Sequence, residues 1–304
     1  MKGFDWLKPK APELKDANAE IRVIGDRSAG KTAYMASLAY WPNAKADSPV
    51  QSVTPVGNQE ASAQLMNMAQ NILEQGLELE PTPLEATVDE VKDYGLSIVL
   101  KEQFSLKNLQ RRLSSSAIRL NVNCKDYSGE FLRDLIHKTG DPRLVDYLED
   151  CVVATGLLLL VDGTSHRKDK DYAIGLEKFL AALDRVDINP KQRRVAFAVS
   201  KCELSQLWVS RHEPRKLTQR RFPLMQNKLE NWVDRGGGEV DYFATSAFGT
   251  LGTNYPEPNS IEKQRDRQGT TSIIRDPRRW RPFGLVSPIY WLCTGQHHKE
   301  LDKD

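Results

Sequence analysis

The sequence lacks a hydrophobic segment long enough to cross a membrane. Its longest apolar run, residues 152–161, is about half the length that a helix needs to span a bilayer. The first six residues, MKGFDW, include charges where a signal peptide requires an apolar stretch. These absences predict a cytoplasmic protein without a membrane span.

Paired cysteines are also missing. The chain has four cysteines, none of them in a Cys-x-x-Cys spacing, and their neighbours are mostly apolar. Cysteines in such surroundings are typically reduced core residues rather than zinc ligands or members of a disulfide framework. They are Cys124, Cys151, Cys202 and Cys293.

The chain has no strong excess of one charge. A formal net charge of +2 over 304 residues does not indicate a nucleic-acid or membrane-surface partner. The fractions of apolar and charged residues, 39% and 28%, are those of a globular protein and exclude wholesale disorder.

What the sequence does contain is an alternation of apolar strands and amphipathic helices, which predicts a mostly parallel α/β sheet covered on both faces. Strands are expected at residues 21–24, 94–104, 117–125, 156–162, 194–200 and 240–244, the second and third as an antiparallel pair. Helices are expected at residues 31–40, 58–75, 131–151, 171–186, 215–235 and 285–293, the third broken near Pro142. Residues 43–57 and the basic segment 249–282 are expected to be loops.

A phosphate-binding motif follows the first expected strand. Residues 25–32 match G-x-x-x-x-G-K-[ST] throughout, and a helix begins near Lys31. Its glycines let the backbone curl so that N–H groups face phosphate oxygens, and the start of the helix adds positive potential. We expect Lys31 to reach the β- and γ-phosphates and the Thr32 hydroxyl to bind Mg²⁺. The residues expected around the phosphates are Gly25, Asp26, Arg27, Ser28, Ala29, Gly30, Lys31, Thr32 and Ala33.

A carboxylate follows the strand expected at 117–125. Asp126-Tyr127-Ser128-Gly129-Glu130 resembles the D-x-x-G element of GTPases, in which the aspartate holds Mg²⁺ through water and the glycine N–H touches the γ-phosphate. The carboxyl end of such a strand is where an open α/β sheet binds ligands. We therefore expect Asp126 and Gly129 at the phosphate site.

Two later segments resemble the elements with which GTPases read the guanine base. Ser200, Lys201 and Glu203 stand where the family has [NT]-K-x-D, whose lysine lies along the purine and whose carboxylate accepts from the ring N–H and the exocyclic NH₂. Adenine offers no such donor pair. Glu203 replaces the aspartate here, so a longer side chain must read the base. Ser246 and Ala247 resemble the S-A element, whose backbone N–H meets the guanine carbonyl oxygen.

In order and spacing these motifs resemble the Ras-like or translation-factor-like class of P-loop GTPases over residues 20–250. The resemblance implies a P-loop NTPase α/β/α sandwich, mostly parallel, with one antiparallel edge strand. It also implies a polar leader at 1–19, a GTPase domain at 20–250, and a basic loop with a C-terminal helix packed on that domain at 251–304. The D-x-x-G-E form and the stretch from Trp280 to Trp291 further resemble bacterial double-GTPase proteins of multi-gene signalling or conflict systems.

The first switch of this family is enlarged here. More than ninety residues separate Thr32 from Asp126, and the extra length lies mainly in residues 43–92. A threonine that binds Mg²⁺ only in the triphosphate state is expected there. Thr82 and Thr87 are the leading candidates, with Thr54 behind them.

The residue expected to govern hydrolysis also differs from the family pattern. Glu130 follows Gly129, where Ras-like proteins carry the glutamine that orients the attacking water. A carboxylate close to the γ-phosphate meets like charge, which predicts slow hydrolysis. No arginine of this chain can be assigned to stabilise the transition state. Arg27 in the loop is a candidate, but a solvent-exposed side chain is favoured there, and the missing charge is then expected from a partner.

Together the motifs predict a molecular switch that binds GTP or GDP with Mg²⁺, hydrolyses GTP slowly and signals to a protein effector or GTPase-activating partner. Two alternatives remain open. An ATP-dependent enzyme or kinase predicts preferential ATP binding and no effect of Glu203→Ala on the choice of purine. A non-hydrolysing scaffold predicts nucleotide that co-purifies and never turns over.

Overall fold

A computed structural model describes residues 15–44, 48–57, 59–76, 91, 93–101, 118–126, 131–138, 141–186, 193–252, 257–265 and 269–302. The strands are β1 (Lys15–Ile24), β2 (Val50–Val56), β3 (Asp93–Leu100), β4 (Ile118–Asp126), β5 (Gly156–Asp162), β6 (Arg194–Ser200), β7 (Glu239–Ala244), β8 (Ser260–Arg265) and β9 (Gly269–Ile274). The longer helices are α1 (Lys31–Ala44), α2 (Gln59–Gln75), α3 (Phe131–His137), α4 (Pro142–Val153), α5 (Asp169–Val186), α7 (Pro214–Arg221), α8 (Pro223–Asp234) and α9 (Val286–Thr294). Shorter turns are η2 (His166–Lys168), α6 (Ser205–Trp208) and η4 (Pro277–Arg279).

Seven strands form one sheet in the order β2-β3-β4-β1-β5-β6-β7. The five strands from β4 to β7 run parallel, whereas β3 is antiparallel to both of its neighbours. The predicted fold class, a mostly parallel α/β/α sandwich of the P-loop type, is confirmed, and β2 with β3 forms its antiparallel edge. The antiparallel pairing expected for the strands at 94–104 and 117–125 is confirmed as well.

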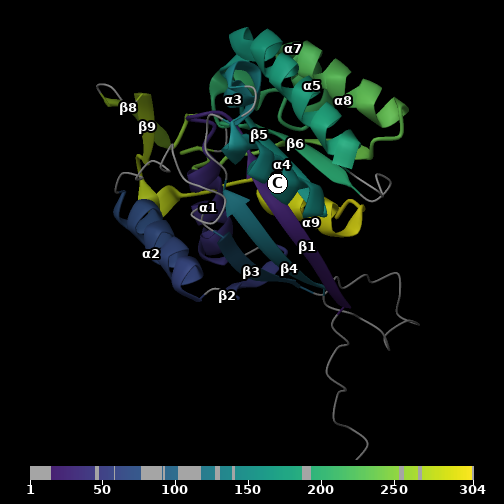
Figure 1. Ribbon diagram of the computed structural model, residues 1–304. Coiled ribbons are helices and arrows are strands. Elements are labelled where there is room, and N and C mark those ends of the chain that lie inside the picture. Colours follow the sequence, from purple (N-terminus) through teal and green to yellow (C-terminus); the bar gives the residue numbers. More distant parts are fainter. Residues whose placement is uncertain are drawn as a thin grey trace, which may run out of the picture.

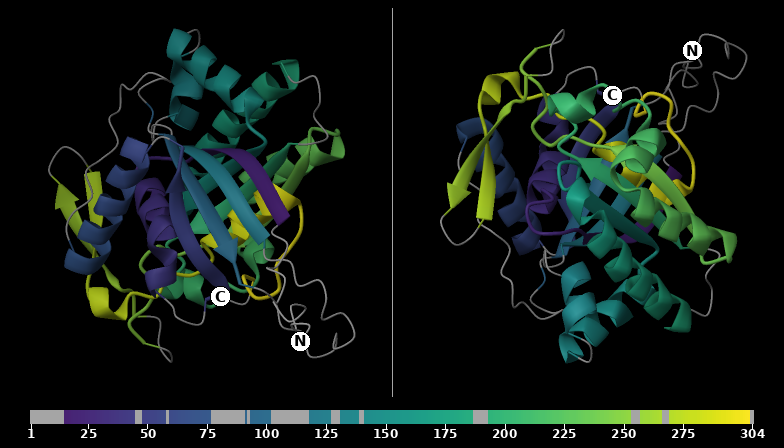
Figure 2. Two further views of the ribbon diagram at one scale, coloured as in Figure 1. Left: turned by 90° about the horizontal axis from the view of Figure 1, so that it is seen from below. Right: turned by 90° about the horizontal axis from the view of Figure 1, so that it is seen from above.

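Helices cover both faces of this sheet, as the ribbon views show (Figures 1 and 2). On one face α1, α2 and α9 enclose a hydrophobic core; on the other face α3, α4, α5, α7 and α8 enclose a second. The central strand β5 is buried along its whole length and contributes to both cores. Its side chains alternate, so Leu158 and Leu160 join the first core while Leu157 and Leu159 join the second.

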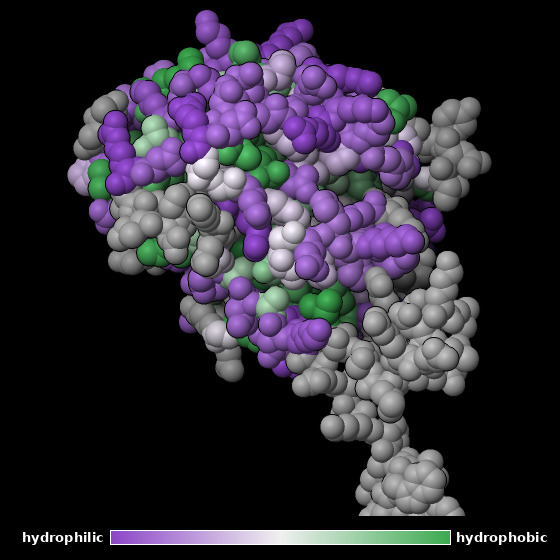
Figure 3. All heavy atoms as spheres, turned by 90° about the vertical axis from the view of Figure 1, so that its right-hand side faces the viewer, coloured by the Kyte–Doolittle hydropathy of each residue, from purple (hydrophilic) through white to green (hydrophobic). Residues whose placement is uncertain are grey.

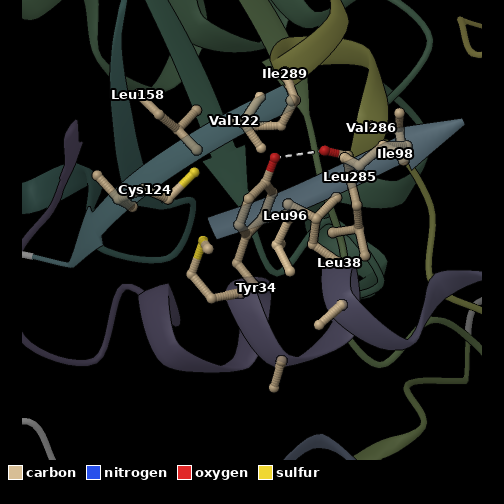
Figure 4. Close-up of a cluster of buried hydrophobic side chains, with 14 of the residues drawn as sticks. Tyr34, Leu38, Leu96, Ile98, Val122, Cys124, Leu158, Leu285, Val286 and Ile289 are labelled. Atoms are coloured by element: carbon tan, nitrogen blue, oxygen red, sulfur yellow. Dashed lines mark hydrogen bonds between the residues drawn. The ribbon is translucent and has the colours of Figure 1, made fainter. Parts of the chain in front are cut away.

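The C-terminal helix α9 is built into the first core beside α1. Tyr34 on α1 is almost fully buried, and its hydroxyl donates a hydrogen bond of 2.5 Å to the Leu285 carbonyl oxygen just before α9 (Figure 4). A buried phenol needs such a partner, because an unpaired hydroxyl in an apolar core is destabilising. The helix after the phosphate loop and the C-terminal segment are therefore directly connected.

Three sequence expectations were wrong for reasons that involve proline. The helix expected to stop at residue 40 continues through Pro42 to Ala44. A proline within the last turn of a helix removes only one intrahelical hydrogen bond. Residues 43–57, expected as a loop, include β2, where Pro55 is tolerated because β2 is an edge strand. The single helix expected at 215–235 is broken before Pro223, which starts α8, because proline disfavours helical geometry in the residue before it.

The start of one strand and the presence of a hairpin also differ from expectation. β1 begins at Lys15, six residues before the predicted start at Ile21, and its polar first half pairs with β4. The basic segment expected to be a loop contains the antiparallel hairpin of β8 and β9. The charged residues of this segment obscured the alternation of apolar and polar residues that predicts a strand.

The prediction of free cysteines is confirmed: Cys124, Cys151 and Cys202 are buried, and Cys293 is partly buried.

The surface seen from the right-hand side of Figure 1 is largely hydrophilic, with hydrophobic side chains in small separate groups (Figure 3). Large exposed apolar side chains lie on different elements, such as Val153 on α4 and Leu224 on α8. Among the residues described, no helix has the length and hydrophobicity to cross a membrane.

Candidate nucleotide-binding site

The parallel strands bring the predicted motifs to one edge of the sheet. β1 runs into the phosphate loop at Gly25, β4 ends at Asp126, β6 ends at Ser200 and β7 is followed by Thr245. Val23 lies in register with Asp126 on the neighbouring strand. Because these strands are parallel, all four carboxyl ends meet at the same edge, which is where ligands bind in such sheets.

The phosphate loop has the curled backbone that its motif predicts. Ser28 and Gly30 have positive φ angles of 66° and 86°. Gly25 lies so close to β5 that a Cβ atom there would be 2.3 Å from the Leu160 carbonyl oxygen, so only glycine fits. The Lys31 ammonium is buried and donates to the Gly25 carbonyl oxygen at 3.1 Å, which folds the lysine back over the loop.

Asp26, the second residue of the loop, is surrounded by hydrogen-bond donors. Its Oδ1 accepts from the Arg27 N–H at 2.8 Å. Its Oδ2 accepts from the Lys168 ammonium at 2.8 Å and the Tyr172 hydroxyl at 2.5 Å. Burial alone raises the pKa of the Asp26 carboxyl, but the hydrogen bonds from Lys168 and Tyr172 outweigh it and hold the pKa below its usual value.

Ser200 connects the phosphate loop to the expected base-reading segment. Its hydroxyl lies 2.7 Å from the Ala29 carbonyl oxygen, to which it donates, and 3.3 Å from the Val161 carbonyl oxygen. Ser200 is buried, so this contact is shielded from competing water. Ser200 thus fixes the position of β6 relative to the loop.

Lys201 adopts a left-handed backbone conformation with φ of 60°. Its ammonium makes a salt bridge of 2.7 Å with Asp162 at the end of β5. Asp162 Oδ1 in turn accepts from the N–H and the hydroxyl of Thr164. The salt bridge thereby holds the Lys201 side chain at the end of β5.

Glu203 is almost fully buried, with 3% of its surface exposed. Its carboxyl is within hydrogen-bonding reach of Ser246, and burial raises its pKa to about 7 although Ser246 and Lys201 oppose the rise. Its Oε2 atom has no hydrogen-bond partner among the described residues. A buried acceptor without a donor costs stability unless a ligand supplies one. The structure therefore brings Glu203 and Ser246, separated by more than forty residues, into contact. It leaves one buried acceptor atom of Glu203 without a hydrogen-bond donor among the described residues.

The loop of Ser246 and Ala247 is held by the C-terminal segment. Ser246 and Phe283 exchange two backbone hydrogen bonds of 3.0 and 3.1 Å. The Ala247 carbonyl oxygen accepts from the Trp280 indole N–H at 2.7 Å and from the Ser37 hydroxyl at 3.1 Å. In a trans peptide the N–H points opposite to the C=O, so the bond from Phe283 to the Ser246 carbonyl also orients the Ala247 N–H.

The same packing predicts a large stability effect at Gly249. This residue has φ of +71°, and a Cβ atom there would lie 1.8 Å from the Arg281 carbonyl oxygen. Gly249→Ala is expected to lower the free energy of unfolding by about 3 kcal/mol or more, measured by urea denaturation. Gly236→Ala is the matched control, because Gly236 has φ of +83° but open space around it, and only the backbone cost of about 1–2 kcal/mol remains. Equal losses in the two variants would contradict the close packing of the C-terminal segment.

Several predicted residues lie outside the described part of the chain. They are Gly129, Glu130, Thr82 and Thr87, and for Asp126 only the backbone is described. Thr54 lies on β2, where it pairs with Ser97 at the outer edge of the sheet. Since β3 and β4 separate β2 from β1, Thr54 is not brought to the phosphate loop.

Sequence reasoning missed the residues that support the site from a distance. Lys168 and Tyr172 contact the phosphate loop from η2 and α5, and Trp280 and Phe283 hold the Ser246 loop. Lys168 and Tyr172 belong to no local motif, and the stretch from Trp280 to Trp291 gave no indication of a contact with Ser246 or Ala247. Only the tertiary structure brings them to their partners.

Comparison with known proteins finds solved structures that resemble this chain, but with low sequence identity and low TM-scores. No family model and no curated protein matches the sequence. Among solved structures, a signal recognition particle receptor SRβ-GTP/SRX complex from Chaetomium thermophilum matches 78% of this chain and 94% of its own at 15% identity and a TM-score of 0.38. The mammalian signal recognition particle receptor matches 75% of this chain and 91% of its own at 14% identity and a TM-score of 0.35. Both identities lie below 25% and both TM-scores below 0.5.

Proposed function

We propose that this chain binds a guanine nucleotide with Mg²⁺, hydrolyses GTP slowly to GDP and phosphate, and signals its nucleotide state to a protein partner. The observation that carries the proposal is a direct contact between two halves of the site. The phosphate half is residues 25–32, and the base half comprises Glu203, Ser246 and Ala247. Ser200 ties the phosphate loop to a segment in which Glu203 has a buried carboxylate oxygen without a donor. A purine with two adjacent N–H donors supplies what that oxygen lacks.

The phosphate half of the site rests on the curled backbone of residues 25–32 and on Lys31. The curled backbone and the positive end of α1 favour a polyphosphate. Lys31, whose ammonium donates to the Gly25 carbonyl oxygen, is proposed to neutralise charge on the β- and γ-phosphates.

The residues expected to hold Mg²⁺ are of the right chemical type. The Thr32 hydroxyl at the start of α1 and the carboxylate of Asp126 at the end of β4 are oxygen donors, which Mg²⁺ prefers. Held by these residues, the ion would supply positive charge that offsets the negative charge of the phosphates. Thr82 remains the proposed third ligand in the triphosphate state.

The hydrolytic step is assigned to Gly129 and Glu130. The Gly129 N–H contacts the γ-phosphate, and Glu130 orients the water that attacks the γ-phosphorus in line and releases GDP. Repulsion between Glu130 and the phosphate makes this step slow in the absence of a partner.

The base half of the site selects guanine through Glu203, Ser246 and Ala247. The ionised Glu203 carboxylate accepts from the ring N–H and the exocyclic NH₂, and the Ala247 N–H donates to the guanine carbonyl oxygen. Adenine presents an acceptor where guanine presents its ring N–H, so it is rejected.

Single-turnover phosphate release from GTP and from ATP tests this function against its two alternatives. We expect slow release from GTP, below about 0.01 s⁻¹ as for GTPases that lack an activating partner, and slower release from ATP. Faster release from ATP indicates the ATP-dependent enzyme, and tight GTP binding with no release at all indicates the scaffold. Either result contradicts the proposed switch.

A further inference from the structure

The phosphate loop contains a carboxylate, Asp26, in a position where negative charge is unfavourable for phosphate binding. Asp26 directly follows Gly25, within the segment proposed to enclose a polyphosphate. Two negative groups so close repel each other, and the repulsion is strong where water is partly excluded. Asp26 is only 18% exposed, so solvent screens it poorly.

The surrounding contacts turn this charge toward η2 and α5. Lys168, the last residue of η2, and Tyr172, in the first turn of α5, both donate to the same oxygen, Asp26 Oδ2. The Arg27 N–H occupies the other oxygen. These three partners of the carboxylate are all donors, and two of them belong to other elements.

These contacts are better anchored than an ordinary surface ion pair. Tyr172 is buried in the second hydrophobic core, so its hydroxyl is held in place by packing. Lys168 is about half exposed, and its ammonium lies 5.8 Å from the centre of the Tyr172 ring. An exposed pair alone contributes little, whereas a pair joined to a buried hydroxyl keeps its geometry.

We propose that Asp26, Lys168 and Tyr172 form a tether that slows nucleotide release by holding the Asp26 carboxylate away from the phosphates and fixing the phosphate loop to α5. Asp26 and its two partners are positioning residues. The proposal rests on the nucleotide site proposed above, and it makes the η2–α5 junction the place from which release is controlled.

Dissociation of a fluorescent methylanthraniloyl-GDP, chased with excess GDP, tests the tether. Lys168→Met and Tyr172→Phe are each expected to raise the dissociation rate, and the double variant by about tenfold or more, because Asp26 then repels the phosphates. Lys170→Met on the exposed side of α5 is the matched control and is expected to leave the rate within about twofold of the wild type, as for a surface change away from the site.

A double-mutant cycle separates charge control from simple structural support. In an Asp26→Asn background the repelling charge is gone, so Lys168→Met is expected to cause no further rise in the rate. Additive effects in that background, or a wild-type rate in the Lys168→Met, Tyr172→Phe double variant, overturn the tether. Wild-type protein that binds no guanine nucleotide overturns the proposed function itself, which distinguishes the two failures.

Discussion

Replacement of Lys31 with methionine is expected to weaken GDP binding by about 100-fold or more. A charge-assisted hydrogen bond in a buried site contributes about 1.5–3 kcal/mol, and in the proposed site the lysine contacts two phosphates. Its stem is buried against the loop, and its ammonium is the buried cation of the motif. Methionine keeps most of the apolar stem but removes the charge. Fluorescence titration with methylanthraniloyl-GDP measures the loss.

Lys216→Met is the matched control for this experiment. Lys216 lies on α7, with 63% of its side chain exposed, and it forms a salt bridge with Glu213. The control is expected to bind GDP as the wild type does. If Lys31→Met remains folded and binds within about threefold of the wild type, Lys31 does not hold phosphates and the loop has another role.

The second large effect is expected at Glu203. Glu203→Gln should reduce GDP affinity at pH 8 by about 100-fold, because the variant replaces an anionic acceptor with a neutral amide that also presents an N–H to the base. ADP affinity should change by less than about threefold, since adenine makes no such contacts. Competition titrations with GDP and ADP measure both values.

Glutamine is the appropriate substitution because it resembles the protonated glutamic acid in shape and charge. The exposed Glu213 offers the control, Glu213→Gln, for which no change in either affinity is expected. Equal losses for GDP and ADP in Glu203→Gln would mean that Glu203 supports the fold of the site and does not read the base.

Guanine binding should also depend on pH in a specific direction. Burial raises the pKa of Glu203 to about 7, so in the free protein the carboxyl is largely protonated below this pH and largely ionised above it. Because the proposed contacts need the ionised form, binding releases a proton, and GDP affinity is expected to fall by about tenfold between pH 8 and pH 6. Glu203→Gln should abolish this dependence. A dependence that persists in Glu203→Gln would assign the titration to another group.

The phosphate loop and the central strands could be predicted because their signals are local. The buried strand β5 is a continuous apolar run, and residues 25–32 form a motif whose backbone geometry follows from its glycines and its following helix. Ser200 ends β6 and Glu203 lies three residues beyond it, so both could be expected near the phosphate loop, since parallel strands place their carboxyl ends together.

The remaining features depend on contacts between distant residues. The Asp26 contacts span more than 140 positions, and the hydrogen bond from Tyr34 to Leu285 spans 251. Neither Lys168 nor Tyr172 has a neighbouring residue pattern that distinguishes it from other polar residues of a helix start. The burial that shifts the pKa of Glu203 is likewise a property of packing, which a strand-end carboxylate does not reveal in sequence.

The central claim is that one site binds both the phosphates and the guanine base. Isothermal titration calorimetry tests it most directly, with the wild-type chain, GDP or ADP, and Mg²⁺ at pH 8. The account predicts one site for GDP, with a dissociation constant in the micromolar range or below, and at least about 100-fold weaker binding of ADP. Equal heats and affinities for the two nucleotides, or no heat from either, would contradict it.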